Sequence, residues 1–365
     1  MSANRKLAFL ATMALTVVAP AGLAGSAAAD ADPRAVYTST NAAAGNQVVV
    51  YDRHADGTLA ETARVATGGT GTGGGLGSQG AVTLTDDGHR LLVVNAGSDE
   101  VSLFNVTHVG LSFVGKAASG GDRPISVTVR GPLAYVVNAG GAANVSGFSV
   151  SDDAITPLSG STEALNVAGP AQVQFTPDGN ALVVTGKATN SIDVFNLDAS
   201  GRPQAPVTSP SAGPTPFGFD FDKEGNLLVS EAAGGAPGAS SSSSYTVQTS
   251  GALSAISGPI PNGQGAACWL VTGNSGKFAY VTNTASGTIS TYRIGSSGSL
   301  SVVSAAAATS GGNPTDEAVS RNGRYLYVIN NNLQAITAYR TAADGSLTAI
   351  PGAALSTQSV GVAAS

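Results

Sequence analysis

The chain has 365 residues, of which 48 are glycine, and carries a formal net charge of −6 from 17 basic and 23 acidic side chains. Only 11% of the residues are charged, and the sequence has no Lys/Arg cluster or basic stripe. Nucleic acids and anionic lipid surfaces bind such basic patches, so we expect neither as a partner. The single cysteine, Cys268, excludes an internal disulfide, and we expect it to be a small buried apolar side chain.

Residues 1–29 have the pattern of a secretory signal peptide. A basic start at Arg5 and Lys6 precedes an apolar run over residues 7–19, and small residues follow at Ala27 and Ala29. We predict cleavage after Ala29, leaving an exported mature domain of residues 30–365 in the medium or cell envelope. An uncleaved anchor is the alternative, although the apolar run is short for a membrane span. We expect no membrane span in the mature chain.

Seven short apolar segments recur through the rest of the chain, most of them ending in Asn or another small polar residue. Their spacing is roughly 48 residues, the length of a four-stranded propeller blade rather than of a helical repeat. The segments are 36–41, 92–95, 135–138, 182–185, 228–231, 280–283 and 327–330. We therefore predict an all-β fold, a seven-bladed β-propeller of four-stranded blades.

The repeat around residues 171–195 shows the pattern most clearly. An alternating strand over 171–175 leads into Thr176-Pro177-Asp178-Gly179, and a second strand runs back over 181–185. Pro sets φ for a tight turn, Asp bonds its own backbone, and Gly accepts a positive φ. Similar turns recur in other repeats, so we expect hairpins on the face opposite the Asn-ending loops.

The two chain ends complement each other. The first repeat begins at its second strand, and Gln358–Val362 is an innermost strand with no blade after it. Pairing of this strand with residues 36–41 closes the ring and removes the open sheet edges. The serine run Ser240–Ser244 follows a Gly/Pro-rich stretch, and we interpret it as a flexible loop insertion in the fifth blade.

Candidate site residues lie where the chain enters each innermost strand and where it leaves each second strand. In a propeller these loops gather on one face around the central channel, so the positions converge in space. The entering positions hold Gln79, Arg123, Gln172, Phe217, Trp269, Asp316 and Glu317, and the leaving positions hold Asn41, Asn95, Asn138, Lys187, Glu231, Asn283 and Asn330. We predict that they form a polar funnel for a small-molecule ligand.

Within this funnel we assign catalytic roles to Arg123, Glu231 and Asp316. We assign substrate binding to Gln79, Gln172, Lys187, Trp269 and Glu317. Each position also has a structural interpretation: the Asn residues form turns, Trp269 packs, and Arg123 neutralises a neighbouring acid. Because strand side chains alternate, only one of Asp316 and Glu317 should face the channel, and the other should be paired or solvated.

The three histidines lie beside turn glycines, away from the funnel, so we expect them to be exposed. Without a histidine there, the funnel cannot assemble a Ser-His-Asp relay or a His-type transition-metal site. We predict no cofactor and no metal, although an oxygen-ligand Ca²⁺ or Mg²⁺ site at the channel remains open.

The repeats resemble those of seven-bladed lactonase-type propellers. The resemblance rests on Tyr135–Asn138, Tyr280–Asn283, Tyr327–Asn330 and the turn Thr176–Gly179, and it covers essentially the whole mature chain. This family includes bacterial 6-phosphogluconolactonase and fungal carboxymuconate cyclase. The resemblance implies that a sugar lactone or small organic acid is opened or closed at the channel face.

The chain departs from the catalytic motifs that the resemblance implies. Catalytic members enter one innermost strand through Gly-Pro-Arg-His, where this chain has Gly169-Pro170-Ala171-Gln172. A Glu that ends the following strand corresponds to Gly186 here, and a His-Pro-His approach corresponds to the run Gly77–Gly80. Repeat identity by itself indicates the fold rather than the chemistry.

Two classes of function follow. The first is an exported lactonase or cycloisomerase, a hydrolase in the former case, in which Arg123 holds the substrate carboxylate or polarises its carbonyl and Glu231 or Asp316 is the general base. The second is a non-catalytic extracellular scaffold that binds a glycan, metabolite or protein, and a structural role at the cell surface remains a third possibility. We expect a monomer, and we disfavour a phosphorylated substrate because the funnel holds one Arg and one Lys.

Overall fold

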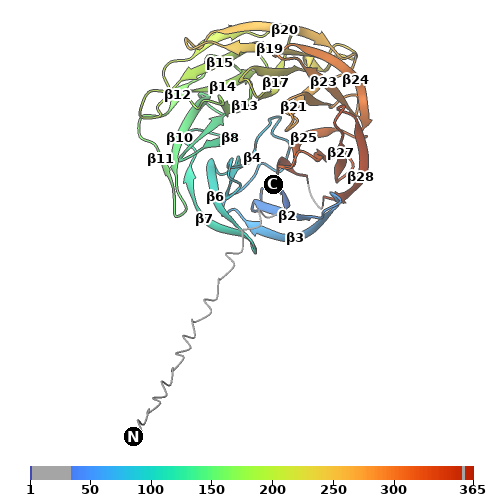
Figure 1. The fold of residues 1–365 in the computed structure, drawn as a ribbon. Helices are drawn as coiled ribbons and strands as arrows, with labels where there is room; N and C mark the ends of the chain where they lie inside the picture. Colours follow the sequence, from blue (N-terminus) through green and yellow to red (C-terminus); the bar gives the residue numbers. More distant parts are fainter. Residues whose placement is uncertain (2–33, 356–357) are drawn as a thin grey trace. The chain divides into compact units, whose positions relative to one another are not determined.

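The computed structural model describes Met1 and residues 34–355 and 358–365. Apart from Met1, the predicted signal peptide lies outside the described residues. Seven antiparallel sheets surround a central axis, as Figure 1 shows. The seven-bladed β-propeller predicted from the repeats is therefore confirmed. Among the described residues, no helix is long and apolar enough to cross a membrane.

Each blade runs from an innermost strand at the axis to an outer strand at the rim. Blade 1 contains β29 (Val360–Ala364), β1 (Ala35–Ser39), β2 (Gln47–Arg53) and β3 (Leu59–Ala66). Blade 2 contains β4 (Val82–Leu84), β5 (Arg90–Asn95), β6 (Glu100–Thr107) and β7 (Gly110–Ala118). Blade 3 contains β8 (Pro124–Arg130), β9 (Leu133–Asn138), β10 (Asn144–Val150) and the short strands β11 (Ile155–Pro157) and β12 (Glu163–Ala164), both paired with β10.

The remaining four blades follow in chain order. Blade 4 contains β13 (Pro170–Phe175), β14 (Ala181–Gly186), β15 (Ser191–Asn196) and β16 (Val207–Pro210). Blade 5 contains β17 (Pro216–Phe221), β18 (Leu227–Glu231), β19 (Ser241–Val247) and β20 (Leu253–Pro261), with the 3-10 turn η1 (Ala233–Gly235) between β18 and β19. Blade 6 contains β21 (Ala267–Thr272), β22 (Phe278–Asn283), β23 (Thr288–Ile294) and β24 (Leu300–Thr309). Blade 7 contains β25 (Pro314–Val319), β26 (Tyr325–Asn330), β27 (Ala335–Thr341) and β28 (Leu347–Ala354).

The apolar core lies between neighbouring blades. One cluster joins Tyr37 and Val50 of blade 1 to Leu91 and Phe104 of blade 2. Second strands such as β22 and β26 are buried along their whole length because both faces of each sheet pack against another blade. Continuous apolar runs such as Tyr-Val-Ile therefore mark second strands, whereas the partly exposed outer strands carry mixed sequences.

The ring closes through the C-terminus, as the sequence predicted. Strand β29 pairs antiparallel with β1, with Val362 opposite Thr38. Ser365 adds a second tie, because its backbone N–H donates to the Ala35 carbonyl at 2.9 Å and its own carbonyl accepts from Arg53 at 2.9 Å. The innermost strand of blade 1 thus comes from the opposite end of the chain to the rest of that blade.

The serine run is not the flexible loop that its composition suggested. Ser241–Ser244 lie in β19, between β18 and β20. All four pair with β18, three of them also pair with β20 across a register shift at Ser243, and all four are buried. Small hydroxyl side chains fit here because Glu231, the last residue of β18, accepts hydrogen bonds from two of them, as described below. Low sequence complexity was therefore a misleading signal of disorder at this position.

The two ends of the central channel are built differently. On one end, which we call the hairpin face, lie the turns between innermost and second strands, including residues 85–89, 176–180 and 320–324. Their glycines adopt positive φ, for example +76° at Gly88 and +77° at Gly179, as the predicted turn chemistry requires. At the other end, the loop face, the chain enters each innermost strand and leaves each second strand.

Candidate functional site

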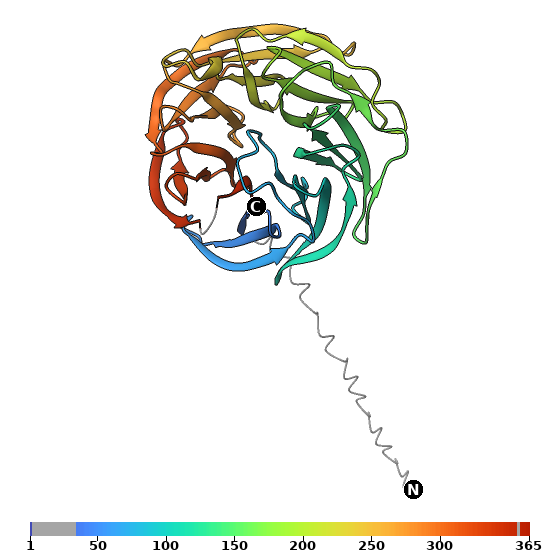
Figure 2. The same cartoon turned by 180° about the vertical axis from the view of Figure 1, so that it is seen from behind.

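A segment between β3 and β4, residues 75–80, passes across the ring axis. We call it the crossing segment. The Ser78 hydroxyl donates to the Ile125 carbonyl in blade 3 at 2.8 Å, and the Gln79 N–H donates to Ala171 of blade 4 at 3.0 Å. The Gln79 side-chain amide then exchanges two hydrogen bonds, of 2.9 and 3.1 Å, with the backbone of Leu270 in blade 6. These anchors hold the chain that lies in the centre of the ring in Figure 2.

The tight fit of Gln79 requires a glycine in blade 5. A Cβ atom on Gly218 would lie 2.1 Å from Oε1 of Gln79 and 2.8 Å from the Cys268 carbonyl. Any side chain at this position would therefore displace Gln79 from Leu270. Gly218 is a site-shaping residue that the sequence reading did not single out.

The crossing segment lies between two cavities. On the loop face, its residues Gly75–Ser78 line a cavity of about 210 Å³, which we call the loop pocket. Towards the hairpin face, Gln79 and Gly80 line a larger cavity of about 490 Å³, the channel cavity, which extends down to the turn residues Asp86, Pro177 and Asp222. The single funnel expected from the sequence is thus two sites.

The loop pocket has a neutral, polar lining and one aromatic wall. Its polar residues are Ser78, Thr284, Asn313, Thr315, Asn331 and Ser359, and its apolar ones include Leu76, Trp269 and Val360. Part of this polar lining is already ordered, since the Asn331 amide donates to Thr315 at 3.0 Å and to the Ser359 carbonyl at 2.9 Å. A pocket of this size and polarity suits a small ligand with several hydroxyl groups.

Lys187, directly after β14, contacts the crossing segment but does not line the loop pocket. Its Nζ donates to the Gly77 carbonyl at 2.5 Å and lies 4.6 Å from the centre of the Phe217 ring. Burial lowers the pKa of Lys187 to about 8; the Cys268 thiol opposes this shift, and the positive charge of Arg123 adds to it. Lys187 can therefore both give and accept a proton near neutral pH.

Arg123 lies on the same face, exposed, with a positive φ of +55°. Its backbone N–H donates to the Asp99 carboxylate at 2.6 Å, which holds the turn. Its guanidinium forms no ion pair within residues 34–355 and 358–365, so Arg123 does not neutralise a neighbouring acid there, which was the structural role considered from the sequence. Arg123 presents its charge to solvent on the loop face.

The structure of Trp269 is relevant to both of the roles predicted for it, packing and substrate binding. Its ring is buried and packs against Phe217 with ring centres 5.2 Å apart, and its Nε1 donates to the Ser78 carbonyl at 3.1 Å. It also forms a wall of the loop pocket. Trp269 thus fixes the crossing segment and offers an apolar surface beside the pocket.

Glu231 lies in neither cavity. It is fully buried and accepts hydrogen bonds from the Gly213 N–H at 2.8 Å and from the hydroxyls of Ser241 and Ser243, both at 2.5 Å. These donors hold the end of β18 to the loop that precedes blade 5. The general-base role predicted for Glu231 therefore has no support in this geometry, which gives the residue a bracing role.

The other residues that leave the second strands also brace loops. Asn138 donates to the Ser119 carbonyl at 3.0 Å, and Asn330 donates to the Ser310 carbonyl at 3.1 Å. In blade 4, where Gly186 occupies this position, Asp193 accepts instead from the backbone of Asn166 and Val167 at 2.8 and 3.1 Å. These contacts favour a structural role in the turns for these residues over a role in ligand binding.

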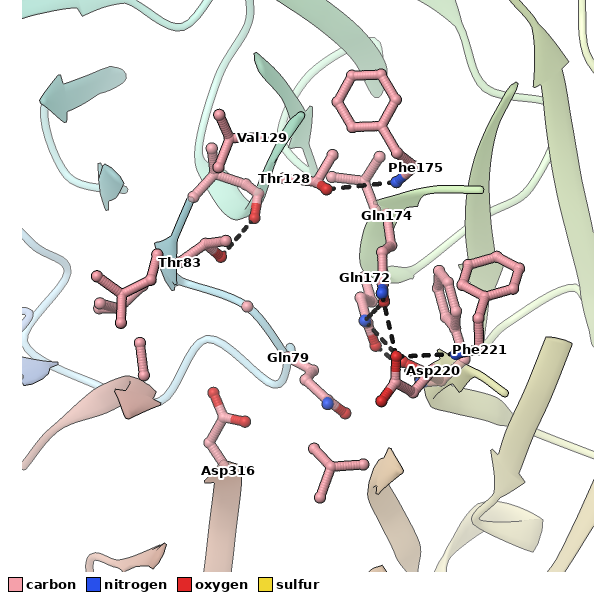
Figure 3. A pocket seen from close by; sticks show the side chains of 18 of the residues that line it. Gln79, Thr83, Thr128, Val129, Gln172, Gln174, Phe175, Asp220, Phe221 and Asp316 are labelled. Carbon is pink, nitrogen blue, oxygen red and sulfur yellow. Dashed lines mark hydrogen bonds between the residues drawn. The ribbon is translucent and has the colours of Figure 1, made fainter. Parts of the chain in front are cut away.

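Gln172 connects blades inside the channel cavity. Its amide exchanges hydrogen bonds of 2.9 and 2.8 Å with the backbone of Phe219 in blade 5. One step lower, Gln174 donates to Asp220 at 3.2 Å, as Figure 3 shows. Asp220 also accepts from both the N–H and the hydroxyl of Thr272 in blade 6 at 2.8 and 2.7 Å. Gln172, like Gln79, uses its side-chain amide to join innermost strands.

Asp316 and Glu317 both belong to the residues that line the channel cavity, and a register shift follows Pro314. Figure 3 shows the Asp316 side chain beside the open space, whereas the Glu317 carboxyl lies near Thr282 of β22 and Tyr339 of β27. Both are also buried, with 1% and 2% of their surface exposed, and neither is ion-paired among the described residues. Burial raises the pKa of Asp316 to about 8, and burial together with the Asp316 charge raises that of Glu317 well above its usual value.

The histidines and the cysteine lie where the sequence placed them. His54, His89 and His108 are all exposed and line neither cavity. Cys268 is buried, and burial raises the pKa of its thiol to about 11, which suits packing rather than nucleophilic attack. Within the described part of the chain, no group of three or more His, Cys, Asp or Glu residues is placed to hold a metal ion.

Comparison with known proteins gives the family. The family model for seven-bladed β-propeller lactonases matches residues 31–154, 150–233 and 232–362. The chain therefore belongs to the seven-bladed lactonase propeller family. The resemblance seen in the repeats is confirmed. A search of the curated proteins finds no match.

Solved structures with similar folds include several lactonase-type proteins. A putative 6-phosphogluconolactonase from Bacteroides uniformis matches with a TM-score of 0.73 and 16% identity, over 91% of this chain and 99% of that chain. A periplasmic gluconolactonase from Pseudomonas aeruginosa matches with a TM-score of 0.68 and 18% identity, over 90% and 98% of the two chains. At these identities the similarity establishes the fold, and the ligand has to be inferred from the site.

Proposed function

We propose that this protein binds a small, unphosphorylated lactone, or the hydroxy acid derived from it, on the loop face and interconverts the two. The ligand occupies the loop pocket and extends over the crossing segment towards Lys187 and Arg123. The observation that carries this proposal is the amine of Lys187, whose pKa burial lowers to about 8 and which contacts Gly77, a residue that lines the loop pocket.

The chemistry follows from that amine. With a pKa of about 8, roughly a tenth of the Lys187 side chains are neutral at pH 7, and these can take a proton from an attacking water. The Arg123 charge faces the same side and stabilises the negative oxygen that develops as water adds to the lactone carbonyl. When the ring C–O bond breaks, the Lys187 ammonium returns its proton to the leaving alkoxide, which leaves the hydroxy acid.

The substrate class follows from the lining. Six hydroxyl or amide side chains and one tryptophan wall favour a polyhydroxylated ring over an extended apolar chain. A phosphorylated sugar would need more cationic groups than Lys187 and the exposed Arg123 supply. A lactone with a free carboxylate substituent would gain an ion pair with Arg123.

The proposal includes export and a monomeric state. The basic, apolar and small-residue pattern of residues 1–29 supports an envelope or extracellular location. The periplasmic location named for the Pseudomonas aeruginosa gluconolactonase is compatible with it. Sequencing of the N-terminus of protein recovered from the medium or periplasm tests this part, with Asp30 expected as the first residue.

A second candidate function is a non-catalytic extracellular binding scaffold for a glycan, metabolite or protein. It is favoured by the replacement of the family's reactive motif with Ala171 and Gln172, and by the use of the Gln172 and Glu231 side chains as structural ties. In that case the loop pocket binds its ligand without turnover.

A screen of sugar lactones and muconolactone-like acids separates the two candidates. The variant Lys187→Met keeps the length of the side chain and removes the amine, and it should lower kcat by about 10²-fold or more. The matched control is Lys223→Met, an exposed lysine on the hairpin face, which should leave the rate unchanged. Binding of a lactone that depends on the loop pocket but shows no turnover would favour the scaffold, and turnover equal in both variants would reject the proposed site.

A further inference from the structure

The channel cavity is separate from the loop pocket and is not used by the proposed lactone chemistry. It begins below the crossing segment at Gln79 and Gly80 and is bounded towards the hairpin face by Asp86, Arg130 and Asp222. Its volume of about 490 Å³ is more than twice that of the loop pocket. A ligand would enter it from the hairpin face, the opposite end of the propeller.

Oδ2 of Asp316, a residue that lines this cavity, has no hydrogen-bond partner among the described residues. The Asp316 side chain is at least nine-tenths buried. In Figure 3, Asp316 projects from β25 into the open space beside Gln79. Unpaired buried acceptors are costly, and native proteins rarely keep them without a partner or a function.

Two other acids, the half-buried Asp220 and the buried Glu231, show what a purely structural carboxyl looks like in this protein. Asp220, in the same cavity, accepts from Gln174, the Phe221 N–H and Thr272. Glu231 accepts from one backbone N–H and three serine hydroxyls. Each has a set of side-chain and backbone donors, whereas Oδ2 of Asp316 has no hydrogen-bond partner among the described residues.

The charges and walls of the cavity indicate the chemical class of the missing donor. Asp86, Asp220, Asp222, Asp316 and Glu317 are opposed by one lining cation, Arg130. The apolar lining includes Phe175, Phe219, Phe221 and Val271. A carboxyl that becomes acceptor-only on ionisation, with apolar residues beside it, suits an ammonium group carried on a short alkyl chain.

We propose that the channel cavity is a second ligand site, entered from the hairpin face, in which Asp316 binds a small primary alkylammonium ion. An ammonium group supplies N–H donors, one of which can meet the unpaired Oδ2 of Asp316.

Binding should also move protons. Burial raises the pKa of Asp316 to about 8, so Asp316 is largely protonated in the free protein at pH 7. An ammonium ion stabilises the ionised form of a neighbouring carboxyl, so its arrival expels a proton to the solvent. The proton leaves Asp316, and no covalent bond between protein and ligand forms.

The test is isothermal titration calorimetry of the mature protein with n-butylamine at pH 7, in two buffers of different ionisation enthalpy. The neutral isostere n-butanol, calcium ion and glycerol serve as alternative probes. We expect n-butylamine to bind with proton release and n-butanol to bind far more weakly. Asp316→Asn should weaken n-butylamine binding by about tenfold or more, because it removes a charge-assisted hydrogen bond. Glu317→Gln should weaken it less, since the Glu317 carboxyl lies near Thr282 and Tyr339.

Controls keep the proposal falsifiable. Each variant is first checked for a cooperative unfolding transition, and Lys187→Met should bind n-butylamine as the wild type does, since Lys187 lies on the loop face. No binding of n-butylamine, equal binding of n-butanol, or binding that survives Asp316→Asn would overturn the proposal. Calcium or glycerol binding that depends on Asp316, without amine binding, would also overturn it. Lactone turnover is measured separately, so failure of one site leaves the other testable.

Discussion

Replacing Asp316 with Asn should stabilise the protein at neutral pH but not in acid. The pKa of Asp316 is raised by burial from its ordinary 3.8 to about 8. Between these values the unfolded chain releases the proton while the folded chain keeps it, so stability is full below about pH 4 and is lost progressively up to about pH 8. Asn has no charged form and removes this pH dependence.

The magnitude follows from the shift. A pH of 7 lies about three units above the ordinary pKa of Asp. Keeping Asp316 protonated in the folded state therefore costs about 1.4 kcal/mol per unit, or about 4 kcal/mol of stability in total. The substitution to Asn removes this cost, which is a gain in stability. The new Asn amide places N–H donors where Oδ2 has no partner, and this lowers the gain by about 1–3 kcal/mol. We therefore expect Asp316→Asn to raise the unfolding free energy by about 1–3 kcal/mol at pH 7.

The assay is urea denaturation of wild type and variant at a series of pH values from 4 to 8. The charged groups that face Asp316 are Glu317 on its own strand and Asp220 across the cavity, so part of the slope persists in the variant through Glu317. Asp344→Asn, at a fully exposed turn, is the control, and it should not reproduce the gain. Equal stability of Asp316→Asn and wild type across the series would refute the reasoning.

Further predictions concern the bracing contacts and the ring. Gly218→Ala should destabilise the protein by about 1–3 kcal/mol, because its Cβ overlaps Oε1 of Gln79, while Gly74→Ala, where a Cβ meets nothing within 4 Å, should not; thermal unfolding of both variants checks this. Glu231→Gln should lower the unfolding free energy, measured by urea denaturation, by about 2–3 kcal/mol, because it places an amide N–H against hydroxyl and backbone donors. If Glu231 only braces the loop, lactone kinetics should be unaffected at a temperature where the variant is folded. Deleting residues 358–365 removes β29 and exposes the edge of β1, so we expect aggregation or a much lower melting temperature; soluble monomer with unchanged melting, in size-exclusion chromatography and a thermal scan, would contradict the ring-closure account.

The sequence was sufficient for the architecture because each blade repeats the same local signals. Buried second strands such as Tyr327–Asn330 and turns such as Thr176–Gly179 identify themselves through apolar runs and Pro-Asp-Gly chemistry. The sequence did not predict a strand at Ser241–Ser244, because its β-structure depends on pairing with β18 and β20 and on the buried Glu231. Neither feature is visible in the local composition.

The site was only partly predictable. Strand order placed Lys187 and Arg123 on one face, but nothing local indicates that Gln79 reaches the backbone of Leu270, 191 positions along the chain. That contact turns a glycine-rich loop into the crossing segment and divides one funnel into two cavities. It also separates Asp316 from Arg123, which the sequence reading had combined in one catalytic site.

The most direct test of the lactone proposal is the pH dependence of kcat/KM for the best lactone of the screen, measured for wild type and Lys187→Met. If Lys187 is the general base, the wild-type profile rises with a midpoint near pH 8, the value to which burial lowers its pKa, and this rise disappears in the variant. A rising limb in the range of a carboxylate, or a rise near pH 8 that persists in Lys187→Met, would contradict the proposed role of Lys187 on the loop face.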